Sequence, residues 1–213
     1  MPGHFEQALA LKIIPVVALE RAADAARLAD ALVAGGLPCA EITFRTAAAA
    51  DAIRALAGRA DFSVGAGTVL DLEQARRAAD SGATFVVCPG LNPKVVRFCL
   101  DGGIPVLPGV CTPSDMTLAF EMGLALLKFF PAEAMGGLKT LDALAGPFPM
   151  MRFVPTGGID PRNLAAYLRH PRVAACGGSW MVKASLIAEG RFDEIARLTR
   201  EAAALAREAA AMP

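Results

Sequence analysis

The chain has 213 residues, of which 54% are hydrophobic, so it can bury a large core, and its length fits one sizeable domain. Lysine plus arginine and aspartate plus glutamate both total 21, and no basic block offers a footprint for nucleic acid or an anionic membrane. The expected partner is therefore a small molecule.

The sequence also bears on the compartment in which the protein works. Its longest apolar run, Ile13–Leu19, is far shorter than the roughly 20 residues that span a bilayer, and the N-terminus lacks the basic leader of a signal peptide. An odd set of cysteines without a CxxC motif indicates reduced thiols in a cytoplasm: Cys39, Cys88, Cys99, Cys111 and Cys176.

His4 and His170, the only histidines, have no ligand-like neighbours, so we expect no metal site.

Apolar segments recur along the chain with amphipathic stretches between them, a spacing typical of repeated βα units. The predicted strands are Ile13–Leu19, Cys39–Phe44, Phe62–Ala66, Thr84–Cys88, Ile104–Leu107, Ala125–Phe130, Phe153–Thr156 and Val173–Cys176. The predicted helices that follow them are Ala22–Val33, Ala47–Gly58, Asp71–Ser81, Pro93–Leu100, Pro113–Met122, Gly137–Leu144, Pro161–Leu168 and Met181–Glu189. One further helix is expected at each end, over Phe5–Leu11 and Arg191–Ala211.

Local signals mark several of these boundaries. Thr112-Pro113 and Asp160-Pro161 combine an N-cap residue with proline at the first helical position, whereas Gly35-Gly36 and Gly102-Gly103 suit left-handed helix ends. Eight strand–helix units predict an α/β fold: a small (β/α)₈ TIM barrel with an extra N-terminal and an extra C-terminal helix, spanning 1–213 as one domain. An open doubly wound sheet is the alternative, but no Gly-rich dinucleotide turn follows the first strand.

One lysine stands inside the apolar stretch Leu124–Glu133, which otherwise resembles a fully buried parallel strand. With alternating side chains, Lys128 points with Leu126 and Phe130 into the space that the strands enclose. An unpaired buried charge costs several kcal/mol, and the neutral amine that avoids this cost is a nucleophile able to form a Schiff base with a ketone. The alternative is a lysine that reaches solvent from a strand end or belongs to a structural ion pair.

A carboxylate is expected in the same interior. Glu41 alternates with Cys39 and Thr43 in the second predicted strand and therefore faces inward, as Lys128 does. It is either a proton shuttle or the partner of the lysine in a structural salt bridge. Arg45 lies on the same face if the strand persists, and it can bind a carboxylate through two hydrogen bonds. Considered by itself, Arg45 is equally compatible with a solvated arginine in a loop.

Two glycine pairs follow the last two predicted strands. Gly157-Gly158 and Gly177-Gly178 allow backbone N–H groups to approach an anion, and the next helix start adds its dipole. Either pair alone is also compatible with a plain turn. Because barrels commonly bind phosphate after strands seven and eight, the two pairs together predict a phosphate site.

Six segments carry these residues: Glu41–Thr46, Val64–Val69, Cys88–Leu91, Leu127–Glu133, Phe153–Ile159 and Gly177–Trp180. Together they resemble the 2-dehydro-3-deoxy-phosphogluconate / 4-hydroxy-2-oxoglutarate aldolase family, in order and with matching spacing. The resemblance implies a class I aldolase on a (β/α)₈ barrel, usually a homotrimer, that needs no metal; we expect no cofactor. Its expected substrate is a phosphorylated 2-oxo acid of carbohydrate metabolism, in the Entner–Doudoroff pathway.

The resemblance also implies a role for each matching residue. Lys128 corresponds to the Schiff-base lysine and Glu41 to the general acid/base. The substrate-binding positions are Arg45 and Thr68 for the pyruvyl carboxylate, Pro89, Phe130 and Thr156 for the pocket lining, and Gly157, Gly158 and Ser179 for the phosphate. The departures are Met135, where a polar residue is expected, and Lys183, where proline is common; the second leaves open how the distal end of the substrate is held.

The implied reaction cleaves 2-dehydro-3-deoxy-6-phospho-D-gluconate to pyruvate and D-glyceraldehyde 3-phosphate, with 4-hydroxy-2-oxoglutarate, split to pyruvate and glyoxylate, as a second substrate. Three alternatives remain at this point. The preferred substrate is the galactonate epimer; or the chain is a sugar-phosphate isomerase or epimerase, which would need paired acid and base groups and no inward lysine; or it is a binding barrel that has lost turnover.

Overall fold

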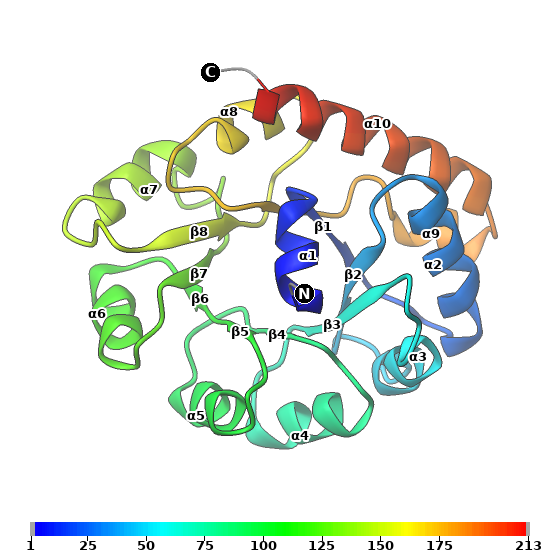
Figure 1. Ribbon diagram of the computed structural model, residues 1–213, viewed down its shortest axis with the longest axis horizontal. Coiled ribbons are helices and arrows are strands. Elements are labelled where there is room, and N and C mark those ends of the chain that lie inside the picture. The colour runs from blue at the N-terminus through cyan, green and yellow to red at the C-terminus, as the bar shows by residue number, and fades with distance from the viewer. Residues whose placement is uncertain (1–2, 212–213) are drawn as a thin grey trace.

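The structure, a computed structural model, describes residues 3–211 and has a curled parallel sheet surrounded by helices (Figure 1). The strands are β1 (Ile13–Val17), β2 (Cys39–Thr43), β3 (Ser63–Gly67), β4 (Val86–Val87), β5 (Val106–Leu107), β6 (Gly109–Val110), β7 (Leu126–Phe129), β8 (Arg152–Pro155) and β9 (Cys176–Gly178). The helices are α1 (His4–Ala10), the 3-10 helix η1 (Ala22–Asp24), α2 (Ala25–Ala34), α3 (Ala49–Leu56), α4 (Leu72–Asp80), α5 (Pro93–Asp101), α6 (Pro113–Glu121), α7 (Gly137–Ala145), α8 (Leu164–Leu168), α9 (Ala184–Ala188) and α10 (Phe192–Ala211). None of these helices is both long and apolar enough to cross a membrane.

The strands pair in parallel in two groups, ordered β5-β4-β3-β2-β1-β9 and β6-β7-β8. Pro108 separates β5 from β6, and its carbonyl accepts a hydrogen bond from the N–H of Lys128 in β7. On the other side, an isolated bridge joins Thr156, just after β8, to Gly177 in β9. The result is a mixed α/β fold whose parallel sheet curls upon itself, unlike an open sheet with helices on both faces (Figure 1).

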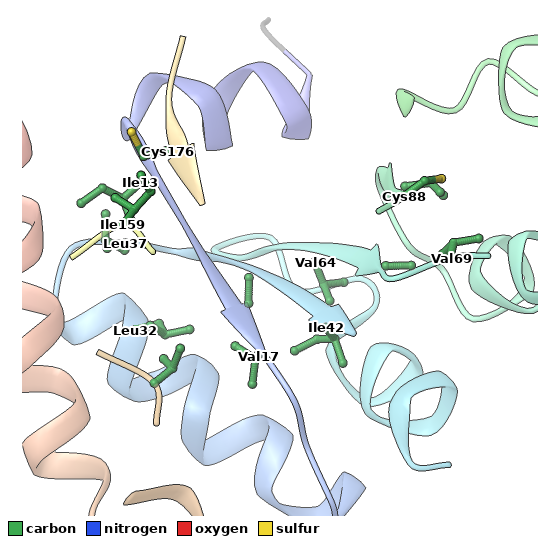
Figure 2. Close-up of a cluster of buried hydrophobic side chains, with 14 of the residues drawn as sticks. Ile13, Val17, Leu32, Leu37, Ile42, Val64, Val69, Cys88, Ile159 and Cys176 are labelled. Carbon is green, nitrogen blue, oxygen red and sulfur yellow. The ribbon is translucent and has the colours of Figure 1, made fainter. Parts of the chain in front are cut away.

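Alternation along the strands divides the apolar side chains between two clusters. The larger cluster lies between the sheet and the surrounding helices, and Figure 2 shows Val17, Ile42 and Val64 from the strands together with Leu32 from α2. The smaller cluster lies on the inner face and joins one residue from most strands to α1: Phe5, Ala8, Ile14, Cys39, Phe85, Val87, Leu107, Val154, Ala174 and Ala175. Helix α1 therefore closes one end of the curled sheet.

One predicted helix start and both predicted left-handed helix ends are confirmed. Helix α6 begins with Thr112 as N-cap in a capping box and Pro113 at its first position. The helix ends at the glycine pairs are left-handed at their second residue, Gly36 with φ of 85° and Gly103 with φ of 65°.

Several predicted elements are wrong at their boundaries. β4 and β5 are shorter than the predicted strands Thr84–Cys88 and Ile104–Leu107, β6 was not predicted, and α9 begins at Ala184 rather than at Met181. For two further elements the structure shows the cause. Asp160-Pro161 does not start a helix: the N–H of Asp160 donates to the Asn163 side chain, so the chain turns first and α8 begins at Leu164. The last strand is not Val173–Cys176 but β9, because its two glycines pair with Ile14 and Pro15 of β1. A Cβ on the first of these glycines would lie 2.3 Å from the Thr156 hydroxyl oxygen, so only glycine fits this strand position.

Candidate active site

Lys128 and Glu41 meet inside the curled sheet, although they come from β7 and β2, which are not neighbours. Lys128 Nζ lies 3.3 Å from Glu41 Oε1, and the two residues are only 4% and 3% exposed. The ammonium group also lies 5.2 Å from the ring centroid of Phe130. The structure thus places an amine and a carboxylate in direct contact and shielded from water, with an aromatic ring beside them.

A glycine in the neighbouring strand makes room for the carboxylate. A Cβ on Gly67 in β3 would lie 2.3 Å from Glu41 Oε1, closer than real Cβ contacts allow. The sequence analysis included this glycine only within the segment Val64–Val69. Gly67 is paired with Thr43, two residues beyond Glu41, and the carboxylate of Glu41 occupies the space that a Cβ on Gly67 would fill.

Cysteine and histidine provide no second acid or base beside this pair. Burial raises the pKa of the Cys88 thiol to about 12, so the thiol stays protonated at neutral pH although the charge of Lys128 acts to lower that pKa. His4 contacts Ser63 next to α1, and His170 contacts Asp142 of α7. Within residues 3–211, no three His, Cys, Asp or Glu side chains lie together as a ligand set for a metal.

An inner cavity of about 180 Å³ is bordered by Phe130, the ring that lies 5.2 Å from Lys128 Nζ, although neither Lys128 nor Glu41 itself lines it. It brings together six of the residues predicted to bind substrate, and it is lined by Val16, Arg45, Phe130, Thr156, Gly157, Gly158, Ile159, Gly177, Gly178 and Ser179. Arg45 reaches it from a loop, because β2 ends at Thr43, and its Nε donates to the Thr43 hydroxyl at 3.2 Å. The guanidinium is exposed and directed at the cavity.

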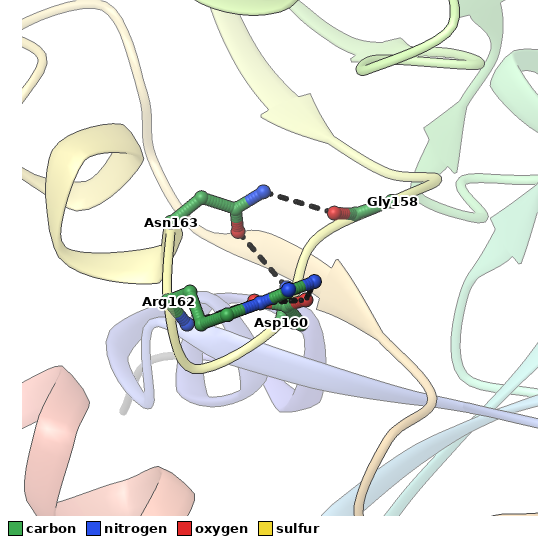
Figure 3. Close-up of polar contacts among 4 residues, drawn as sticks. All are labelled: Gly158, Asp160, Arg162 and Asn163. Carbon is green, nitrogen blue, oxygen red and sulfur yellow. Dashed lines mark hydrogen bonds and ion pairs between the residues drawn. The ribbon is translucent and has the colours of Figure 1, made fainter.

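An outer cavity of about 470 Å³ shares Val16, Arg45, Gly158, Ile159 and Ser179 with the inner one and is otherwise lined by Ala18, Asp160, Trp180, Val182, Lys183 and Ala184. Its one acidic residue, Asp160, accepts hydrogen bonds from the backbone and guanidinium of Arg162, which lowers the pKa of that carboxyl and offsets its charge (Figure 3). The departure at Lys183 therefore adds a cation to this cavity. Met135 does not line either cavity and is 39% exposed.

Thr68 and Pro89 do not line either of the two cavities. Thr68 follows β3 with a left-handed backbone, φ of 54°, which is uncommon for a β-branched residue. The carbonyl of Pro89 packs against Gly109, where a Cβ would lie 2.1 Å away, and Gly109 is paired with Lys128. Pro89 therefore lies at the same level of the sheet as Lys128, with Gly109 of β6 between them.

The two glycine pairs differ in conformation. Gly157 and Gly158 have φ of 98° and 82°, values that side chains rarely adopt, and they form the loop after β8. Gly177 and Gly178 belong to β9, and a Cβ on Gly178 would lie 2.0 Å from the ring of Trp180. The first pair shapes a loop, and the second lets an aromatic side chain cover the backbone.

Sequence reasoning missed Val16, Ile159 and Trp180, which line the cavities, and Asn163, which holds a cavity loop. Val16 could have been predicted, since it lies two residues after the inward-facing Ile14 in the same strand and therefore shares its face. Asn163 could not be found in this way, because Asp160-Pro161 predicted the start of a helix where the structure has a turn.

The family model described as KDPG and KHG aldolase matches residues 6–198. The chain is 52% identical over 198 residues to a 2-dehydro-3-deoxy-phosphogluconate aldolase of Treponema pallidum, covering 92% of this chain and 94% of that protein. It is 45% identical over 191 residues to a KHG/KDPG aldolase of Escherichia coli, with 89% and 90% covered.

Among solved structures, the chain is similar to KDPG aldolase from Legionella pneumophila with pyruvate captured at low pH as a covalent carbinolamine intermediate. The TM-score is 0.88 at 37% sequence identity, over 92% of this chain and 96% of that chain.

Proposed function

Because the chain belongs to the KDPG and KHG aldolase family, it is an aldolase, and we propose that it cleaves 2-dehydro-3-deoxy-6-phospho-D-gluconate to pyruvate and D-glyceraldehyde 3-phosphate. The observation that carries this proposal is the buried contact of 3.3 Å between Lys128 and Glu41. The double name of the Escherichia coli relative supports 4-hydroxy-2-oxoglutarate as a second substrate.

The first step is the attack of Lys128 Nζ on the C2 carbonyl of the substrate. The amine must be neutral to attack, and Glu41 is close enough to take the proton of the ammonium group. The carbinolamine then loses water to give an iminium, a Schiff base whose positive charge makes it an electron sink. The covalent carbinolamine of pyruvate in the Legionella pneumophila structure supports this order.

Glu41 then serves as the base for carbon–carbon cleavage. It removes the proton of the C4 hydroxyl through a water molecule; the C4–O bond becomes the carbonyl of the aldehyde, and the C3–C4 electron pair moves into the iminium. Glyceraldehyde 3-phosphate leaves, and pyruvate remains bound as an enamine. Glu41 returns the proton to C3, and hydrolysis of the iminium frees pyruvate and Lys128.

The remaining residues orient the two ends of the substrate. Arg45 and Thr68 bind the pyruvyl carboxylate, and the residues around the reacting carbon are Pro89, Phe130 and Thr156. The phosphate binds at Gly157, Gly158 and Ser179. Two of these, Gly158 and Ser179, border both cavities, which supports a phosphate site where the two cavities meet. Its binding energy can be used to hold C4 in line with Glu41.

The proposal extends to architecture and assembly. The sheet closes into a full (β/α)₈ barrel, residues 1–213 form one domain, and α1 and α10 are additions to the eight repeats; the bridge between Thr156 and Gly177 supports closure. The protein acts as a homotrimer, as the resemblance to the family implies, and light scattering tests this. Its partner is the small phosphorylated substrate rather than nucleic acid or membrane, and its five unpaired cysteines suit the cytoplasm.

Two other activities are less well supported. An isomerase or epimerase needs a second acid or base near the substrate, and the thiol of Cys88 is unsuited to be that base, since burial raises its pKa to about 12 and keeps it protonated. A preference for the galactonate epimer is decided by contacts at C4. A side-by-side cleavage assay with both phosphorylated epimers and the unphosphorylated acid separates these substrates.

Borohydride reduction in the presence of pyruvate tests the proposal. The iminium should be reduced to a stable secondary amine, and peptide mapping should find the pyruvyl adduct on Lys128. An adduct on Lys94 or Lys139, or no adduct, would remove the assignment. A binding barrel without turnover would form no adduct on any lysine.

A further inference from the structure

The loop after β8 holds two consecutive peptide groups in fixed orientations. The carbonyl of Gly157 accepts a hydrogen bond from the N–H of Glu133 at 3.1 Å. The carbonyl of Gly158 accepts one from Nδ2 of Asn163 at 2.9 Å (Figure 3). Gly158 borders both cavities, whereas neither Glu133 nor Asn163 lines either of them.

The orientation of these carbonyls determines where the N–H groups point. In a trans peptide, the C=O and the following N–H point in opposite directions, and among the described residues only Phe130–Pro131 is cis. The N–H of Gly158 is therefore directed away from Glu133, and the N–H of Ile159 away from Asn163. Because the hydrogen-bond partners of the carbonyls lie outside the cavities, the two N–H groups face the side on which Gly158 and Ile159 border them.

These two N–H groups are free to bind an anion. Within residues 3–211, no acceptor takes a hydrogen bond from the N–H of Gly158 or of Ile159. Backbone N–H groups that lie at a cavity wall require an acceptor, and two successive ones form a concave site for an anion. The nearby carboxylate of Asp160 does not oppose this, since it is paired with Arg162 at 2.9 Å (Figure 3).

We propose that Asn163 is a positioning residue that holds the Gly158–Ile159 peptide so that the N–H of Ile159 becomes a donor to the distal phosphate of the substrate. The side-chain amide is itself oriented, because its Oδ1 accepts the N–H of Asp160 at 2.9 Å while its Nδ2 donates to Gly158. The inference rests on the proposed function, since it names a determinant of its phosphate site. It adds Ile159 and Asn163 to that site.

Substitution of Asn163 tests the inference. Asn163→Asp keeps an acceptor for the N–H of Asp160 but loses the donor to Gly158, and Asn163→Ala loses both bonds without adding charge. Both variants should raise KM for the phosphorylated substrate, and the inhibition constant of inorganic phosphate, by roughly tenfold, the effect of one weakened hydrogen bond to a charged group. The kinetics on unphosphorylated 4-hydroxy-2-oxoglutarate should not change.

Asn92 offers a matched control. Its Nδ2 donates to the carbonyl of Leu70 at 2.9 Å and its Oδ1 accepts the N–H of Lys94 at 3.0 Å, the same pair of bonds in a loop that lines neither cavity. Asn92→Asp and Asn92→Ala should leave KM for the phosphorylated substrate unchanged.

The outcomes separate this inference from the proposed function. Equal changes of KM on both substrates, or none, in the Asn163 variants would overturn the positioning role while borohydride still trapped pyruvate on Lys128. Loss of trapping in the unsubstituted protein would instead refute the aldolase mechanism. A lower Tm with unchanged affinity for phosphate would mean that Asn163 acts only on stability.

Discussion

The two ends of the curled sheet are built from the same strands and differ in nearly every property. At the end covered by α1, the inner face is apolar, and the rings of Phe5 and Phe85 pack with centroids 5.1 Å apart. Further along the same strands, the inner face carries Glu41 and Lys128 and then opens into the cavities. The apolar end stabilises the fold, and the other end carries the catalytic groups. Substitutions at the first end should therefore lower the free energy of unfolding, whereas substitutions at the second should lower activity.

The largest effect is expected for Lys128→Ala. Without the amine no Schiff base forms, so cleavage and borohydride trapping should both be lost. The fold should survive, although Glu41 would keep a buried charge without a partner, at a cost of roughly 3–5 kcal/mol in the free energy of unfolding. Adding Glu41→Gln to this variant should therefore restore part of the lost Tm. If the Lys128→Ala protein still cleaved substrate, the assignment of catalysis to the end of the sheet that carries Lys128 would be wrong.

Glu41→Gln alone should lower kcat by about 10²–10⁴-fold, the usual contribution of a positioned acid or base. Pyruvate should still be trapped on Lys128, but slowly, because the amine remains and its proton acceptor is gone. Rapid-quench kinetics would measure the two rates. Unchanged turnover would show that Glu41 is a structural partner of the lysine and not a proton shuttle.

Phe85→Ala tests the opposite end. Removal of this fully buried ring should lower the free energy of unfolding by about 3–5 kcal/mol, through lost burial and the cavity left behind. Below the new Tm, kcat should be unchanged, because the ring packs on α1 and not on the cavities. Denaturant unfolding and steady-state assays on the same preparation check both statements, and a matching loss of kcat would mean that the ends are coupled.

The smallest effect is expected for Ser179→Ala, at the rim shared by both cavities. Loss of one hydrogen bond to the phosphate should raise KM for the phosphorylated substrate by roughly tenfold. The KM for 4-hydroxy-2-oxoglutarate should change little, because that substrate has no phosphate. If both KM values rose equally, the phosphate would have to bind elsewhere.

Much of this arrangement could be predicted because its signals are local. The period of two along a strand placed Glu41 and Lys128 on the inner face, and Thr112-Pro113 marked a helix start that α6 adopts. The same kind of signal failed at Asp160-Pro161, because a side chain three residues on, Asn163, takes the N–H of Asp160 and delays α8. Local patterns are reliable only where no nearby side chain competes for the backbone.

The sequence by itself determined the repeated strand–helix order and the inward direction of the lysine and the glutamate, since both depend on residues close together in the chain. Only the tertiary structure decided that these two side chains, 87 positions apart, touch at 3.3 Å. It also decided that Gly157-Gly158 forms a left-handed loop while Gly177-Gly178 lies in a strand. The physical reason is that the conformation of a glycine pair depends on what packs against it. Pro131 and Glu133 lie against the first pair and Thr156 and Trp180 against the second, and this packing exists only once the sheet has curled.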